Sequence, residues 1–403
     1  AGNGDHQGSG RVGGDGVMNQ WKYVKLGEVC TIERGGSPRP IDDFITTDEN
    51  GINWIKIGDA DESMYITKTA QRIKPEGMKK SRYVKPGDFL LSNSMSFGRP
   101  YILKIDGCIH DGWLVLRDEN NVFDKKFLYY YLSAPITYKK FKSMAVGGVV
   151  NNLNSDMVRK VRVPMPSQEE QHQISDRLDR VSNLIFLRKQ QLAKLDELVK
   201  ARFVEMFGDP IRNEKGWNTY TLAEMCDGIG DGLHGTPEYD ENGEYPFING
   251  NNLISGIIQI NPSTKKVNKK TYEKHYIKIS QNAILLSING TLGRIAFYNS
   301  EQVMLGKSAC YCNLRDEVNR IFVYNIMKTD AFARYLEDNA TKSTIKNVGL
   351  KAIREYRLIM PPIPLQNQFS SFVERVDQQK QTVQQSLEKL ELMKKVLMQE
   401  YFG

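Results

Sequence analysis

Two stretches of the chain place apolar residues at alternating steps of three and four, with polar residues between them. After the prolines at 164–166, and with Arg188 filling one place, the first stretch runs through Ile174, Leu178, Val181, Ile185, Leu192, Leu195 and Val199. After Pro364, with two lysines filling gaps, the second includes Val373, Val376, Val383, Leu387, Leu390 and Leu397. Such steps are typical of a coiled-coil seam, so we predict spacer helices at 164–208 and 362–403.

These helices are expected to need a partner. A helix of about 40 residues with a narrow apolar stripe is marginal in water on its own. Two such seams in one chain therefore favour an antiparallel coiled-coil pair within the molecule. The alternative is that each helix packs only against its own domain. Gly208 and Pro210 are typical of a helix end, so the first helix should stop there.

The remaining chain reads as short β-type runs broken by Gly, Asn and Pro. The clearest runs are 52–57, 88–91, 101–105, 113–116, 283–288 and 295–298. We therefore predict an α+β fold, in which two mixed, β-rich domains at 18–163 and 209–361 are joined by the two long helices.

The sequence repeats itself once, in collinear order. Matching elements are Trp21 and Trp217, Leu26 and Leu222, Cys30 and Cys226, Arg99 and Arg294, and the runs 164–168 and 362–366. The offset stays between 195 and 198 residues, which chance similarity does not explain. A duplicated unit predicts pseudo-twofold symmetry, which suits a ligand with its own approximate dyad, such as double-stranded DNA.

Composition narrows the class of protein. The 403 residues are 40% hydrophobic and 26% charged, as in ordinary globular proteins, and contain five cysteines, which fits free thiols in a cytoplasmic protein. No apolar run is long enough for a membrane span. The Gly-rich residues 1–17 read as a disordered leader or tag. A net charge of +7 permits an anionic partner without proving one.

Motifs for catalysis are missing. The run Gly306-Lys307-Ser308 resembles the end of a phosphate loop, but Glu301 stands where that loop needs a glycine. The histidines and cysteines do not have the spacing of a metal site. We therefore expect no catalytic residue, metal or cofactor in this chain.

Polar loops between the predicted strands favour recognition of nucleic acid. Asn suits bidentate contacts to adenine, and Arg suits guanine or phosphate. The DNA-binding candidates are Arg39, Arg99, Asn151, Asn152, His234, Asn249, Asn251, Asn252, Arg294, Lys342 and Lys346. Positions shared by both repeats, such as Arg99 and Arg294, better suit phosphate contacts, whereas differing positions carry sequence choice. For any one candidate, the alternative is a turn-forming residue or a solvated charge.

The helical segments resemble a known family. The run 164–171, the end of the first helix at 206–210, Trp217, and the second helix from 366–369 to 399–402 are similar to the specificity subunits of type I restriction-modification systems. The resemblance covers about 18–403. It implies two target-recognition domains for a bipartite asymmetric DNA sequence, with the helices setting the gap and binding two methyltransferase subunits.

The same resemblance places the chemistry in partner subunits. It implies that S-adenosylmethionine, ATP and Mg act there, in methyltransferases that modify adenine N6 and in motor-nuclease subunits that cut DNA. Three other hypotheses stay open. They are a specificity subunit of another restriction-modification class, a non-catalytic scaffold that binds protein or RNA, and an enzyme with an unfamiliar active site.

Overall fold

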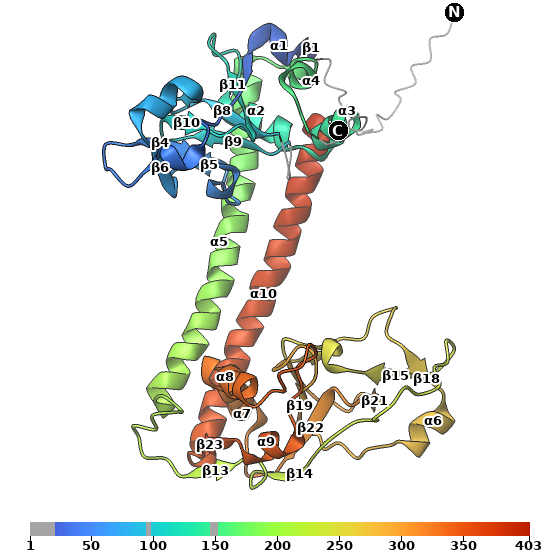
Figure 1. Cartoon of the computed structure of the whole chain (residues 1–403). Coiled ribbons are helices and arrows are strands. Elements are labelled where there is room, and N and C mark those ends of the chain that lie inside the picture. Colours follow the sequence, from blue (N-terminus) through green and yellow to red (C-terminus); the bar gives the residue numbers. More distant parts are fainter. Residues whose placement is uncertain (1–20, 94–97, 146–151) are drawn as a thin grey trace, which may run out of the picture. The chain divides into compact units, whose positions relative to one another are not determined.

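The computed structural model describes residues 21–93, 98–145 and 152–403, which are drawn in colour in Figure 1. The leader proposed at 1–17 and the candidate Asn151 lie outside the described residues. Contacts divide the chain into two compact units. Unit 1 contains the residues up to Leu187 together with Leu387–Gly403, and unit 2 is Arg188–Ser386.

Unit 1 contains two five-stranded sheets. The first has the order β2 (Thr31–Arg34), β11 (Trp113–Arg117), β8 (Phe89–Ser92), β9 (Pro100–Leu103) and β5 (Tyr65–Ile66). The second has the order β3 (Ile45–Thr46), β6 (Gln71–Ile73), β4 (Ile52–Ile55), β10 (Gly107–Ile109) and β7 (Arg82–Val84). A ribbon joins β1 (Lys22–Lys25) to β12 (Arg162–Met165). The helices are α1 (Leu26–Val29), α2 (Lys125–Ser133), α3 (Pro135–Ala145) and α4 (Ser155–Arg159), with short 3₁₀ turns between strands.

The first sheet of unit 1 is buried on both faces. Side chains of a strand alternate between faces, so Phe89 and Leu91 pack with Phe127 of α2, whereas Leu90 packs with Trp113 on the other side. A strand with both faces buried reads as a continuous apolar run, which is why the sequence predicts β8 within one or two residues.

Unit 2 repeats this plan with smaller sheets. One sheet has the order β14 (Cys226–Asp231), β22 (Ala309–Leu314), β19 (Ala283–Ser287) and β20 (Ile295–Phe297). A second has the order β18 (Lys266–Val267), β15 (Tyr245–Ile248) and β21 (Met304–Leu305). Two pairs are β13 (Thr219–Thr221) with β23 (Arg357–Ile359) and β16 (Leu253–Ile254) with β17 (Ile257–Ile258). The helices are α6 (Lys269–Lys274), α7 (Arg320–Met327), α8 (Asp330–Asp338) and α9 (Leu350–Glu355).

Both long helices are present, as α5 (Gln168–Phe207) and α10 (Ile363–Phe402). The first begins four residues later than predicted, because Pro164 and Met165 belong to β12 instead. In unit 1 the start of α5 lies beside the end of α10, where Arg177 donates to the Tyr401 hydroxyl at 3.1 Å. In unit 2 the end of α5 lies beside the start of α10, where Lys380 pairs with Asp196 at 2.7 Å. The pair is therefore antiparallel, as predicted (Figure 1).

The predicted seam is the buried side of these helices. Buried positions are Ile174, Leu178, Val181, Leu195, Val199, Val373, Val376, Val383 and Leu387. Half-buried positions are Ile185, Leu192, Leu390 and Leu397. Within each unit the seam therefore joins a hydrophobic core instead of facing water.

Each long helix ends in an aromatic cluster. In unit 1, the Phe402 ring lies 5.6 Å from those of Phe127 and Tyr131. In unit 2, the Phe207 ring lies 4.9 Å from that of Phe322 and 5.5 Å from that of Phe369. Phe207 and Phe402 are one repeat apart, so the same contact anchors a helix end in each unit.

One sequence alignment within the repeat is wrong. Matching 164–168 to 362–366 pairs Gln168 with Gln366, but the buried counterpart of Gln366 is Gln171. Gln171 accepts from the Asp124 backbone N–H at 2.8 Å, and Gln366 accepts from that of Asn319 at 3.0 Å. The offset is thus 195, as in the neighbouring elements. The two Pro-x-Pro-x-Gln runs are similar in sequence, but their glutamines are not structurally equivalent, because only Gln171 makes the contact that Gln366 makes.

Candidate nucleic-acid interface

Loops that hold most of the unit 2 candidates meet at one edge of its sheets. In the antiparallel pair of β19 and β22, the last residue Ser287 faces the first residue Ala309. The parallel pair of β15 and β21 ends at the same place, where the Gly306 N–H donates to the Ile248 carbonyl at 2.8 Å. The loops 231–236, 249–252, 287–294, 306–308 and 341–347 are linked at this edge. We call it the loop edge of unit 2.

An identical loop closure holds Arg99 and Arg294 in the two units. The Arg99 N–H donates to the Ser92 hydroxyl at 3.0 Å, and the Arg294 N–H donates to that of Ser287 at 2.8 Å. The preceding residues Gly98 and Gly293 have φ of +78° and +77°, which favours glycine. The structural equivalence of the two arginines is therefore confirmed, while their contact with DNA stays a prediction.

Arg294 connects two loops of the loop edge. Its guanidinium donates to the Asn251 carbonyl at 3.3 Å, and it lines a hollow of about 340 Å³ with Tyr324 and Lys328. The Asn251 side chain is exposed beside it. Arg294 and Asn251 are thus brought together by the fold, although they are far apart in sequence.

Two other asparagines of this loop have local hydrogen bonds. The Asn252 side chain accepts from the Asn249 N–H at 3.0 Å and donates to the Gln259 carbonyl at 3.0 Å. The Asn249 side-chain oxygen accepts from the Ser308 hydroxyl at 2.9 Å. These contacts shape the loop, so the turn-forming alternative has direct support at Asn249 and Asn252. Base contact by either residue stays a prediction.

The other unit 2 candidates differ in their surroundings. His234 is exposed and lies 2.8 Å from the Asp231 carboxylate. Lys346 pairs with Glu337, and its carbonyl accepts from the Gly290 N–H at 2.9 Å. Lys342 is exposed. The backbone contact places the 341–347 loop beside the Arg294 loop.

Sequence reasoning missed Lys307 as a candidate. Its backbone N–H donates to the Leu233 carbonyl at 3.0 Å, and its side chain is exposed at the loop edge. The run 306–308 was considered only as the end of a phosphate loop, which Glu301 rules out. Lys307 could still have been proposed as a DNA-binding candidate, because it follows an apolar run, as the polar loops of the other candidates do.

In unit 1 the corresponding loops gather around Asp111. Its carboxylate accepts from the Ser37 hydroxyl at 2.9 Å and lies 3.5 Å from the exposed guanidinium of Arg39. Partial burial would raise the pKa of Asp111, but the Ser37 hydrogen bond and the charges of His110 and Arg34 outweigh it and lower the pKa. Arg39 thus lies beside a carboxylate that stays ionised at neutral pH, in a group of loops that we call the loop edge of unit 1.

The Arg99 loop and the candidate Asn152 lie at this same edge. The Asn93 side chain donates to the Asp111 carbonyl at 2.9 Å, and the Asn93 carbonyl accepts from the Leu153 N–H at 3.0 Å. Asn152 precedes Leu153 and is exposed. The fold therefore groups Arg39, Arg99 and Asn152, which the sequence places far apart.

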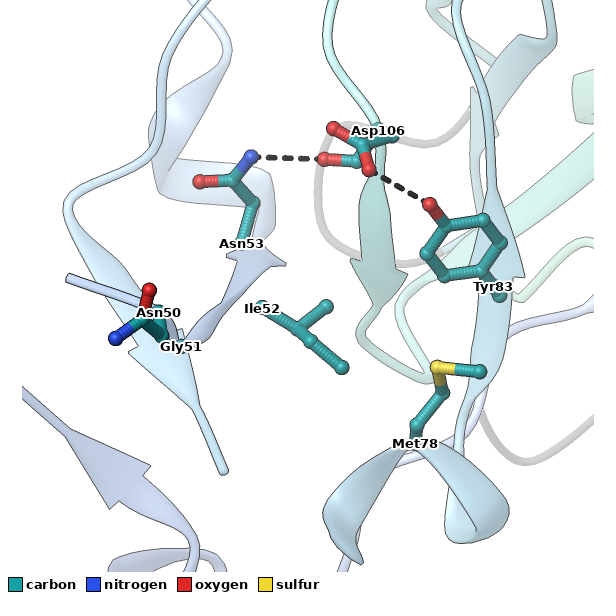
Figure 2. A pocket seen from close by; sticks show the side chains of 7 residues that line it. All are labelled: Asn50, Gly51, Ile52, Asn53, Met78, Tyr83 and Asp106. Carbon is teal, nitrogen blue, oxygen red and sulfur yellow. Dashed lines mark hydrogen bonds between the residues drawn. The ribbon is translucent and has the colours of Figure 1, made fainter. Parts of the chain in front are cut away.

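Unit 1 also has a hollow, which is shown in Figure 2 and has a volume of about 530 Å³. The Tyr83 hydroxyl donates to the Asp106 carboxylate at 2.6 Å, and the Asn53 amide donates to the Asp106 carbonyl at 2.9 Å. Its main polar groups thus bind one another.

Over the described ranges, no three His, Cys, Asp or Glu residues form a group suited to a metal ion. No helix in the same part of the chain could span a membrane.

The long helices also expose large apolar side chains at positions outside the seam. In unit 1 these are Leu184, Phe186, Leu187, Leu392, Met393 and Val396, and in unit 2 they are Leu198 and Val204. Phe186 is 59% exposed and Leu392 is 61% exposed. Exposed apolar groups of this size are typical of surfaces that bind a partner.

Comparisons with known proteins agree with this geometry. A family model described as the type I restriction modification DNA specificity domain matches residues 18–197 and again 214–392. The specificity subunit of the type I restriction enzyme MjaIX from Methanocaldococcus jannaschii is 22% identical, over 89% of this chain and 87% of its own length. The StySPI specificity subunit from Salmonella potsdam is 19% identical over 89% and 81%.

Two solved structures share the fold. A chain solved in work on complex assembly and conformational transition of the type I R-M system has a TM-score of 0.60 and 17% identity, covering 95% of this chain and 97% of its own. The type I restriction-modification S subunit from M. genitalium has a TM-score of 0.58 and 16% identity, with coverages of 96% and 98%. The family model matches the chain twice, and its two matches coincide with the two repeats.

Proposed function

The chain belongs to the type I restriction modification DNA specificity family, and we propose that each of its units reads one half of a bipartite, asymmetric DNA sequence. The observation that carries this proposal is the loop edge found in both units. The same loop closure presents Arg99 and Arg294, while the neighbouring loops differ in sequence. Shared arginines suit the phosphates that all DNA offers, and differing amide loops suit two different half-sites.

We propose that the two helices set the spacing of the half-sites and bind two methyltransferase subunits. The exposed apolar side chains on α5 and α10 support this, because water contact with Phe186 and Leu392 is unfavourable without a partner. The family also supports motor-nuclease subunits as further partners and a cytoplasmic location, where DNA is accessible.

In this proposal the chain has no catalytic role. The partner subunits hold S-adenosylmethionine, ATP and Mg, and methylate adenine N6. A methyltransferase must take its target base out of the stack. The specificity subunit contributes by binding the flanking sequence, which brings that base to the partner.

A selection experiment tests the proposal. The full chain with its methyltransferase subunits is incubated with a random duplex DNA library, and a random RNA library serves as the comparison. We expect enrichment of one motif with two short defined halves and an undefined gap. Binding to RNA alone, or to DNA without any preferred motif, would favour the scaffold hypothesis instead.

A further inference from the structure

A tight turn follows β10 in unit 1 and β21 in unit 2, at the loop edge of each unit. In the turn 110–113 the last N–H donates to the first carbonyl at 3.1 Å, and in the turn 306–309 the same hydrogen bond measures 2.9 Å. The second residues of these turns are Asp111 and Lys307. The same backbone position therefore carries a carboxylate in unit 1 and an ammonium group in unit 2.

The neighbouring strand confirms that the two turns are equivalent. The third carbonyl of the turn accepts from the Asn93 N–H at 2.9 Å in unit 1 and from the Ile288 N–H at 3.1 Å in unit 2. Asn93 directly follows β8 and Ile288 directly follows β19, the strands that precede Arg99 and Arg294. The reversal of charge thus lies beside the loop closure that both units share.

A second loop packs against the turn in each unit. In unit 1 this loop is 34–39, where the Gly36 N–H donates to the carbonyl before the turn at 3.2 Å. In unit 2 it is 231–236, where the Leu233 N–H makes the same bond at 2.8 Å. The first loop contains two arginines, whereas the second contains neither Arg nor Lys. The Lys or Arg at this place is therefore on the loop in unit 1 and on the turn in unit 2.

Asp111 is partly held by its own unit. Its Oδ1 atom accepts from the Ser37 hydroxyl at 2.9 Å and lies 2.9 Å from the Nε2 atom of His110. In the part of the chain that the structure describes, its Oδ2 atom has one partner, the Arg39 guanidinium at 3.5 Å. Because the Asp111 side chain is 30% exposed, Oδ2 can accept a hydrogen bond from a ligand at the loop edge.

Lys307 is held by its backbone alone. Its N–H donates to the Leu233 carbonyl at 3.0 Å, and its side chain is exposed. Within residues 21–93, 98–145 and 152–403, its ammonium group has neither a carboxylate partner nor a hydrogen bond. This ammonium group can therefore give its hydrogen bonds to a ligand.

The two groups are opposite in hydrogen bonding as well as in charge. An ammonium group only donates, and an ionised carboxylate only accepts. In the major groove, guanine presents two acceptors, whereas adenine and cytosine each present an amino donor. A carboxylate placed against the guanine acceptors would be repelled, and such repulsion is an effective way to exclude a ligand.

The reversal argues against a shared phosphate contact at this position. Duplex DNA offers phosphates to both units alike, and each phosphate attracts cations. A carboxylate at an equivalent phosphate would weaken binding in unit 1. A position that differs in this way between the repeats therefore suits the choice of a base.

We propose that this position determines specificity in both units. Lys307 selects guanine at one base pair of its half-site, and Asp111 rejects guanine at the equivalent base pair in favour of adenine or cytosine. The proposal rests on the proposed function and deepens it, because it identifies residues by which one duplicated edge binds two different half-sites.

Two substitutions in the full chain test the proposal. Lys307→Met removes the ammonium group and keeps an unbranched stem, and Asp111→Asn removes the charge and keeps an acceptor oxygen. The control for the first is Lys351→Met on α9, which is exposed and lies outside the loop edge. The control for the second is Asp106→Asn. Asp106 also accepts from a hydroxyl, that of Tyr83 at 2.6 Å, but it precedes β10 instead of following it.

Each variant, in complex with the methyltransferase subunits, is put through the selection from a random duplex library. Lys307→Met should lower the preference for guanine roughly tenfold at one base pair of one half of the motif. Asp111→Asn should raise the share of guanine by a similar factor at one base pair of the other half. Both controls should select the motif of the unsubstituted chain.

Three results would overturn the proposal. They are equal weakening on all duplexes, changes in the same half of the motif for both variants, and motifs equal to those of the controls. Thermal unfolding of each variant checks that the fold is kept. If Asp111→Asn is unstable, the variant of the exposed Lys307 decides the result alone. An unsubstituted chain that selects no motif would instead contradict the proposed function itself.

Discussion

Arg99 and Arg294 show how the duplication constrains single residues. Each follows a glycine with positive φ and donates its N–H to the serine that begins the loop. The Arg99 guanidinium lies 5.8 Å from the Tyr101 ring, whereas that of Arg294 donates to the Asn251 carbonyl. The backbone is therefore shared while the side-chain surroundings differ.

Substitution Arg294→Gln tests the role of this arginine. If it binds phosphate, we expect weaker binding to all duplexes by a similar factor and a salt slope smaller by about 1. Arg334→Gln on α8 is the control, because Arg334 is exposed and lies outside the loop edge. A changed preference at one base of the motif would instead assign Arg294 to base reading, worth about 1–3 kcal/mol.

The cysteines should be unreactive in the native chain. All five are buried, and burial, with a contribution from Asp118, raises the pKa of Cys30 to about 12. Because the thiolate is the reactive form, alkylation of Cys30 at pH 8 should be roughly a thousandfold slower than in denaturant. Mass spectrometry after iodoacetamide treatment measures this. Rapid labelling of Cys30 in the native chain would show that its surroundings open to solvent.

At the element scale, α5 carries two phenylalanines with opposite roles. Phe207 is fully buried in the aromatic cluster of unit 2, and Phe186 is 59% exposed in unit 1. The first belongs to the core of a recognition unit, and the second belongs to the proposed partner surface.

We predict that Phe207→Ala destabilises unit 2 by about 3–5 kcal/mol, because it leaves a cavity among packed rings. Phe186→Ala should change stability by less than about 0.5 kcal/mol, since its ring already contacts water. Hydrogen exchange in urea, followed in peptides of β19 and β22, compares the two variants. Equal stability of the two would mean that the helix end does not support unit 2.

Although substitution of Phe186 should hardly affect stability, we expect it to affect partner binding strongly. Phe186→Ser should weaken association with the methyltransferase subunits roughly tenfold or more, whereas Gln190→Ser on the same helix should have little effect. Titration calorimetry with the purified partner measures both. An unchanged affinity for Phe186→Ser would remove this residue from the proposed docking surface.

The sequence predicts the long elements well and the short ones poorly. Heptad spacing places α5 and α10 within a few residues, because the seam positions are the buried or half-buried side of each helix. Two-residue strands such as β5 and β16 have no periodicity to detect. The site was partly predictable, since Asn, Gly and Arg mark the loops, but the hydrogen bonds that occupy Asn249 and Asn252 depend on Ser308 and Gln259, which only the fold brings close.

At the scale of the whole molecule, the proposed function uses the duplication in two ways, to dock two copies of one partner and to bind two different half-sites. Helix α10 follows α5 after one repeat and has the same number of residues, 40 each. The proposal that the helices set the spacing of the half-sites, which we call the ruler proposal, depends on these two helices alone. It therefore predicts that their length, and not the length of any loop, sets the gap between the half-sites.

Inserting four residues into the middle of both helices should lengthen the gap by one or two base pairs. Four helical residues add at most about 6 Å, and one base pair rises 3.4 Å. The same four residues inserted into the 209–216 turn serve as the control and should leave the gap unchanged. The motif of each variant complex is read by the random-library selection. An unchanged gap after helix insertion would contradict the ruler.

The central claim is that this chain chooses the DNA sequence for its partners. Its most direct test is a single-molecule methylome of cells that express the companion methyltransferase with or without this chain. We predict N6-methyladenine at one bipartite motif only when the chain is present. With the methyltransferase confirmed to be active, the absence of any chain-dependent motif would contradict the account.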